Sequence, residues 1–172
     1  GFFDLILGHG TTTAVAFCSV HPTSADAYFA EAARRNMRMI GGKVMMDRNA
    51  PEGLTDTAQQ GYDETKVLIE RWHGKGRLHY AVTPRFAPTS SDEQLAAAGQ
   101  LLREYPDLYM HTHLSENTNE IAWVKELFPE QNGYLDVYDH FNLLGERSVF
   151  AHGVHLEEPD FKRLTETQSS IS

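Results

Sequence analysis

Two kinds of hydrophobic pattern alternate along this chain, one typical of β-strands and the other of amphipathic helices. Runs rich in β-branched and apolar residues predict five strands, at residues 10–20, 37–47, 78–83, 108–114 and 148–152. Apolar positions at helical spacing predict helices that start near residues 24, 57, 91, 117, 133 and 157. Ile171 is expected to open a sixth strand. The pattern therefore predicts repeated strand–helix units.

Short polar side chains mark the expected beginnings of several helices. Ser24 is the predicted N-cap of the first helix, and Asn117 can cap the helix that follows the fourth strand. Ser91 and Gln94 have the spacing of a capping box. Gly41 and Gly42 lie within the second predicted strand and permit a bend or a bulge there.

Repeated strand–helix units indicate an α/β fold with a parallel sheet and right-handed crossovers. We expect a (β/α)8 TIM barrel that is incomplete in this chain and covers about strands 2 to 7; a doubly wound sheet is the alternative. No glycine-rich phosphate loop follows any strand, which argues against a dinucleotide-binding fold. Residues 1–172 are predicted to form one partial barrel domain. The chain starts without Met and stops in an apparent strand, which suggests a piece of a longer protein.

Composition narrows the class of protein. A chain of 172 residues can bury a core as one domain. Its net charge of −9 argues against binding to a nucleic-acid backbone, and no apolar run reaches the length of a membrane span, so neither partner is expected. Cys18 is the single cysteine, which excludes a disulfide framework and predicts a reducing, cytoplasmic location.

Residues suited to catalysis or metal binding lie near the carboxyl ends of the predicted strands. His111 and His113 alternate in the fourth strand and therefore lie on one face, with Glu116 three residues further on. The fifth strand also ends in a histidine, His152. Histidine can bind a metal and a carboxylate can carry a proton, which are the requirements of metal-assisted hydrolysis. The alternative is a buried histidine pair with a capping carboxylate.

Other residues at strand ends are weaker candidates. Arg85 follows the third strand and is either a functional donor or a surface-loop arginine paired to an acid. His21 and Asp47 lie just past strands and are interpreted as loop residues. Cys18 is interpreted as a small buried hydrophobe, and Trp123 as a packing residue. TIM-barrel enzymes build their active sites at this end of the strands.

Several sequence motifs resemble a known family. THLSEN at 112–117 and FAHGVHL at 150–156 resemble the fifth and sixth strands of the amidohydrolase superfamily. Three further motifs resemble the guanine deaminases within that superfamily: GTTTA at 10–14, MMDRNAP at 45–51 and VTPRFAPTSS at 82–91. The resemblance runs along essentially the whole chain.

This resemblance implies zinc-dependent hydrolysis of guanine to xanthine and ammonia, in purine catabolism or salvage. It implies that His113 binds zinc and that Glu116 shuttles protons. His152 would orient the attacking water or itself bind the metal. Arg85 and Phe86 would contact the purine, and His113 and Glu116 would also touch the substrate. The implied cofactor is one Zn²⁺ per active site.

The family also uses an H-x-H on strand one and an aspartate on strand eight, and neither of those two segments is in this chain; His111-Thr112-His113 is not the strand-one motif, because HLSEN assigns it to strand five. The remaining zinc ligands are therefore expected outside this chain, and the 172 residues alone are expected to be inactive. Two alternatives stay open: an amidohydrolase for a different amino-heterocycle or an amide, and an inactive barrel fragment that acts as a binding module. The expected partner is the small molecule guanine, and a homodimer is left open.

Overall fold

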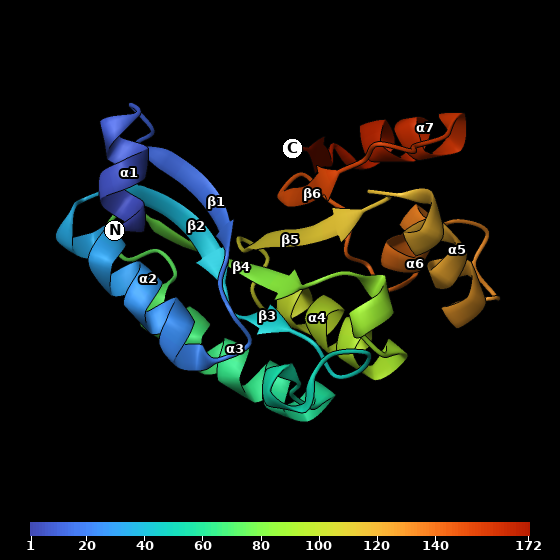
Figure 1. Ribbon diagram of the computed structural model, residues 1–172, viewed down its shortest axis with the longest axis horizontal. Coiled ribbons are helices and arrows are strands. Elements are labelled where there is room, and N and C mark those ends of the chain that lie inside the picture. Colours follow the sequence, from blue (N-terminus) through green and yellow to red (C-terminus); the bar gives the residue numbers. More distant parts are fainter.

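A curled sheet of parallel strands forms the centre of the molecule, and the computed structural model describes all residues from 1 to 172 (Figure 1). Seven strands lie in the order β1-β2-β4-β5-β6-β7, with β3 paired to β4 off this path. Every pairing is parallel. The strands are β1 (Thr13–Phe17), β2 (Arg38–Gly42), β3 (Val44–Met45), β4 (Leu78–Pro84), β5 (Tyr109–Leu114), β6 (Ser148–His152) and β7 (Ser170–Ile171).

Apart from α1, which precedes β1, the helices lie between strands in the sequence, and they cover the convex face of the sheet (Figure 1). They are α1 (Phe2–Gly8), α2 (Pro22–Arg34), α3 (Ala58–Trp72), α4 (Asp92–Glu104), α5 (Thr118–Leu127), α6 (Tyr134–His140) and α7 (Glu158–Thr167), with short 3-10 turns η1 (Glu52–Leu54) and η2 (Ala87–Thr89). No helix is both long and apolar enough to cross a membrane. From β1 onward the alternating order agrees with the prediction, except that the second predicted strand is divided; α1 was not predicted.

The main core lies between the sheet and its helices, where 28 buried apolar side chains form one cluster. A second, small cluster of Val20, Val44 and Met46 lies around the ends of the first strands. Burial of apolar surface at about 25 cal/mol per Å² is the main force that holds helices against a sheet. The curvature of the sheet brings the strand ends toward a common edge.

The predicted second strand is two strands separated by Lys43. β2 pairs with β1 and β4, whereas β3 pairs only with the last residues of β4. Gly42 lies at the break, and a Cβ atom there would be 2.0 Å from the carbonyl oxygen of Ala81. Only glycine permits this approach of the two backbones. The prediction of one continuous strand over residues 37–47 was therefore wrong, because the strand breaks at Lys43, directly after the two glycines that were expected to permit a bend.

The caps of the helices differ in part from the prediction. Ser24 is not an N-cap, because α2 begins two residues earlier at Pro22 with His21 in the capping position. Proline suits the first helical position because it lacks an N–H that would be unpaired. The Ser24 hydroxyl oxygen instead accepts a hydrogen bond from the N–H of Ser19 at 3.1 Å. Asn117 caps α5 as predicted, since its side-chain oxygen accepts from the N–H of Glu120 at 3.0 Å.

The capping box predicted at Ser91 is only half formed. The Ser91 hydroxyl accepts from the N–H of Gln94 at 3.2 Å, but the Gln94 side chain turns away and donates to Asp56 at 2.7 Å. The N–H of Ser91 donates instead to Asp47 at 2.7 Å. A carboxylate distant in sequence therefore takes the place that the capping box assigns to Gln94.

Candidate active site

Two histidines lie side by side at the carboxyl ends of β5 and β6. The register pairs His113 with Ala151 and Leu114 with His152, so the two imidazoles come from neighbouring strands. Their rings are stacked, with centroids 5.4 Å apart and an interplanar angle of 24°. Glu116 follows β5, and its Oε2 lies 3.5 Å from Nε2 of His152. The structure thus places His113, Glu116 and His152 together at one edge of the sheet.

The backbone carbonyl of Arg85 fixes the orientation of His113. Its oxygen accepts hydrogen bonds from the His113 N–H at 3.1 Å and from His113 Nδ1 at 2.7 Å. A carbonyl oxygen can only accept, so Nδ1 carries the ring proton and Nε2 of the neutral ring has a free lone pair. Burial lowers the pKa of His113 below its ordinary value, which favours this neutral form. His113 is therefore prepared to ligate a metal through Nε2.

The backbone at the end of β6 is held in a sparsely populated conformation. His152 has a φ of +79° and Ser115, after β5, has a φ of +48°. Hydrogen bonds join the two loops, because Gly153 donates to the carbonyl of Leu114 at 2.8 Å and His155 donates to that of Ser115 at 3.1 Å. Left-handed backbone at non-glycine residues costs about 1–3 kcal/mol each, and such residues concentrate at functional sites.

His111 shares a face with His113, as the alternation predicts. The Phe17 ring from β1 stacks on both imidazoles, with centroid distances of 3.9 Å to His111 and 4.3 Å to His113. Burial, together with the nearby His113, lowers the pKa of His111 to about 4, so both rings are neutral near pH 7. The contact from Phe17 was missed by sequence reasoning; its only signal is an aromatic residue at the end of the first strand.

Arg85 and Phe86 lie beside the histidines at the end of β4. The Arg85 guanidinium is exposed and forms no ion pair with a carboxylate; it lies 5.2 Å from the Phe86 ring and 3.6 Å from the sulfur of Met46. The Phe86 ring makes edge contacts with His113 and with Trp123, each at 6.3 Å between centroids. Arg85 is therefore not the acid-paired surface arginine of the alternative interpretation. Trp123, predicted as a packing residue, is 37% exposed at the border of this group.

A loop after β3 clamps the segment that follows Arg85. The Asp47 carboxylate accepts from both the N–H and the hydroxyl of Ser91, and its own N–H donates to the Thr89 carbonyl at 3.0 Å. Arg48 donates to the carbonyl of Ala87 at 3.2 Å. These contacts hold η2 in place. Asp47 is a loop residue, as predicted, and its role is to fix this segment.

The remaining candidates from the sequence lie in other positions. His21 precedes α2 and is exposed, in agreement with its interpretation as a loop residue. Cys18 is a free cysteine that packs against the main core, and burial raises the pKa of its thiol to about 11. The thiol therefore stays protonated near neutral pH and behaves as a small hydrophobic group.

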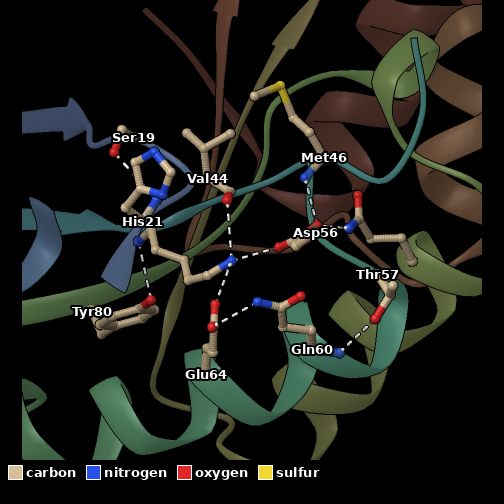
Figure 2. A network of polar contacts seen from close by, with 11 residues as sticks. Ser19, His21, Val44, Met46, Asp56, Thr57, Gln60, Glu64 and Tyr80 are labelled. Carbon is tan, nitrogen blue, oxygen red and sulfur yellow. Dashed lines mark hydrogen bonds and ion pairs between the residues drawn. The ribbon is translucent and has the colours of Figure 1, made fainter. Parts of the chain in front are cut away.

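A buried ion pair between Lys43 and Asp56 lies beside the loop that follows β3 (Figure 2). The ammonium group of Lys43 donates to Asp56 at 2.5 Å and lies 3.3 Å from the carboxylate of Glu64 on α3. Asp56 also accepts from the N–H of Met46 at 3.2 Å and from Gln94 of α4 at 2.7 Å. The network thus ties the strand end beside Arg85 to two helices. Sequence reasoning missed it, although Lys43 is conspicuous as the one lysine in an apolar run.

The site offers part of a metal-binding set. His113 and His152 supply imidazole nitrogens, a donor type that suits zinc, and the Glu116 carboxylate lies beside His152. No group of three or more His, Cys, Asp or Glu side chains lies close enough together to hold a metal ion. These residues therefore fit a metal as contributors to a larger ligand set.

Known proteins resemble this chain over its whole length. The amidohydrolase family matches residues 5–172. Guanine deaminase of Escherichia coli (strain K12) is 61% identical over 171 residues, which are 99% of this chain and 39% of that protein. Guanine deaminase of Dictyostelium discoideum is 40% identical over 171 residues, covering 98% of this chain and 38% of that protein. The chain thus spans about 39% of the length of the first of these relatives.

Solved structures agree with the sequence comparison. The structure of E. coli guanine deaminase matches with a TM-score of 0.98 and 61% identity, over 99% of this chain and 40% of that chain. A guanine deaminase from C. acetobutylicum, solved with guanine bound in its active site, matches with a TM-score of 0.95 and 30% identity, over 99% of this chain and 41% of that chain. These matches confirm the predicted fold, an incomplete (β/α)8 barrel, over the doubly wound alternative.

Proposed function

Because this chain belongs to the amidohydrolase family, we propose that residues 1–172 are part of the catalytic domain of a zinc-dependent guanine deaminase. The reaction is the hydrolysis of guanine to xanthine and ammonia. One observation carries the proposal: His113, Glu116 and His152 meet at adjacent strand ends, beside an arginine without an acidic partner. The activity is proposed for a polypeptide that joins this chain to the further length that its relatives have.

The metal would be held in part by the two stacked histidines. His113 contributes Nε2, because its Nδ1 is engaged with the Arg85 carbonyl. His152 either joins the ligand set or orients the attacking water through its contact with Glu116. When bound, zinc lowers the pKa of water to about 7 and so makes hydroxide available near neutral pH. The remaining ligands would come from outside this chain.

Glu116 is the proposed proton carrier. Its side chain is about half exposed, with a relative accessibility of 49%, and lies at the edge of the site beside His152. It would take a proton from the attacking water and deliver it to the purine ring nitrogen. It would then take the proton of the hydroxyl group newly bonded to the reacting carbon and pass it to the amine, so that the C–N bond breaks, the carbonyl of xanthine forms and ammonia leaves. A carboxylate can serve these steps when it lies within hydrogen-bond reach of both groups.

Arg85 and Phe86 would read the base. The guanidinium presents a planar fork of N–H donors, suited to the carbonyl oxygen of guanine, and no carboxylate in the chain competes for it. Phe86 lies against His113 and would contact the purine ring next to the reacting carbon. His113 and Glu116 would also touch the substrate. The small-molecule substrate and a free cysteine suit the cytoplasm, where we place the enzyme.

The test is a measurement of ammonia and xanthine released from guanine by the full-length polypeptide. We expect turnover that stops when a chelator removes the metal and returns when Zn²⁺ is added. The 172-residue chain alone serves as the control and is expected to retain little zinc and to release no ammonia, because it offers no group of three ligands. Release of ammonia from other amino-heterocycles but not from guanine would instead support the alternative amidohydrolase. No release from any of them would support an inactive binding module.

A further inference from the structure

A single buried hydroxyl on α6 links the two halves of the proposed site. Tyr138 is fully buried, and its hydroxyl oxygen accepts a hydrogen bond from the N–H of Ala87 at 2.9 Å. The same hydroxyl donates to the backbone carbonyl of His113 at 2.8 Å. Ala87 directly follows Arg85 and Phe86, the two residues proposed to read the base. One oxygen atom therefore joins the Arg85–Phe86 loop to the end of β5, which bears His113. Figure 1 shows α6 beside the end of β5.

Thr112 completes this junction. Its hydroxyl lies 3.2 Å from the Tyr138 hydroxyl and 3.2 Å from the carbonyl oxygen of Arg85. A threonine hydroxyl has one hydrogen, which these two acceptors must share. The Arg85 carbonyl also accepts from the His113 ring. The hydroxyl groups of Tyr138 and Thr112 therefore surround the contact that orients the imidazole.

The surroundings of Tyr138 keep its hydroxyl in the donor form. Burial raises the pKa of the phenol well above its ordinary value. The Tyr138 ring is held between Tyr134 and Phe150, with centroid distances of 5.6 Å and 5.7 Å. Removing the hydroxyl would leave the buried N–H of Ala87 without a partner, since the packed ring prevents water from replacing it.

We propose that Tyr138 is a positioning residue, whose hydroxyl fixes the Arg85–Phe86 loop relative to His113. This inference rests on the proposed function, because it assigns the loop to base reading and the histidine to the metal. Loss of the hydroxyl removes the contact that holds Ala87 against the carbonyl of His113, and only the bonds to the Arg85 carbonyl then join the loop to the strand end. Selectivity for the base and affinity for zinc then fall together, although Tyr138 touches neither.

The experiment compares Tyr138→Phe with Tyr134→Phe in the full-length polypeptide. Tyr134 is the matched control, because it lies one turn earlier on α6, is also buried, and its hydroxyl makes no hydrogen bond to Ala87 or to His113. Each change removes one phenolic oxygen atom from a tyrosine of the same helix. Only the change at Tyr138 breaks the junction.

Two readouts separate positioning from general destabilisation. For Tyr138→Phe we expect zinc affinity, measured by competition with a chelator, to fall about tenfold, as is typical for partners of metal ligands. We expect kcat/KM for guanine to fall about tenfold, and by less for 2-aminopurine, which lacks the carbonyl that Arg85 would read. Tyr134→Phe should leave both quantities close to wild type.

Unchanged zinc affinity and an unchanged guanine to 2-aminopurine ratio in Tyr138→Phe would overturn the inference, as would equal effects of the two variants. If Tyr138→Phe does not fold, Thr112→Val removes the neighbouring hydroxyl at constant shape and should change both readouts in the same direction. No such change in a folded Thr112→Val protein would also overturn the inference. Wild-type turnover of guanine is measured separately, so failure of the proposed function is distinguished from failure of the role of Tyr138.

Discussion

Replacing Lys43 by methionine should destabilise the protein strongly. Methionine retains much of the apolar stem but removes the ammonium group, which contacts Asp56 at 2.5 Å and Glu64 at 3.3 Å. The Lys43 and Asp56 side chains are 0% and 2% exposed, so water cannot replace the lost partner. Removing one member of a buried ion pair costs about 3–5 kcal/mol, because it leaves the other charge uncompensated. A typical domain has a total stability of only about 5–15 kcal/mol.

The control for this prediction is Lys66→Met. Lys66 forms an ion pair with Glu104 at 3.1 Å, but the two side chains are 39% and 31% exposed. Water replaces the partner at such a position, so the free energy of unfolding should change far less than in Lys43→Met. In both substitutions, methionine replaces a lysine that forms an ion pair. The comparison therefore isolates the effect of burial.

Urea unfolding of the full-length protein, followed by circular dichroism and tryptophan fluorescence, gives the two free energies. Trp72 is a suitable reporter because it lies on α3, the helix that carries Glu64, and its indole N–H donates to Asp26 at 2.7 Å. Equal losses in the two variants, or a loss below about 1 kcal/mol in Lys43→Met, would refute the argument that the buried pair holds this region together.

Three further predictions concern the site. Glu116→Gln should keep zinc and lose turnover, whereas His113→Ala should lose both; metal analysis and ammonia release decide this, and a Glu116→Gln protein with most of its activity would contradict the proton role. Arg85→Ala should retain zinc and lower kcat/KM for guanine by about ten- to several-hundred-fold, with a smaller loss for 2-aminopurine. Arg85→Lys should recover only part of the loss. Equal losses on both substrates would show that Arg85 supports the loop and does not read the base. The folded-state pKa of His111 is lowered to about 4, so its contribution to stability is fully present above the unfolded pKa of about 6.5 and is lost as the pH falls toward 4. The variant His111→Phe should therefore lose less free energy of unfolding than wild type between these two pH values. An unchanged pH dependence of the free energy of unfolding would contradict this prediction.

Local patterns were sufficient to predict the order of strands and helices. The placement of His111 and His113 on one face follows from the two-residue period of a strand, and the end of β4 follows from Pro84. The prediction of Ser24 as an N-cap was wrong because it gave no weight to Pro22, which begins α2. Each of these outcomes depends on residues that are close in sequence.

Contacts between distant segments could not be predicted in the same way. Gln94 has ideal spacing to return to Ser91, yet it donates to Asp56, which is 38 residues away in sequence. Tyr138 reads as one more apolar position of a short helix, and nothing local indicates that its hydroxyl bonds to Ala87 and His113. Such partners are determined by how the helices dock on the sheet, and a single sequence does not contain that information in its periodicity.

The carbonyl of Arg85 has a consequence for how such a site can change. The group that orients His113 belongs to the main chain, whereas the group proposed to read the base belongs to the side chain of the same residue. Every amino acid supplies the same carbonyl, so a substitution at this position can alter substrate preference and still retain the support of the histidine. Position 85 is therefore a favourable starting point for redesigning specificity, and a natural one for divergence between enzymes that share the same hydrolytic chemistry.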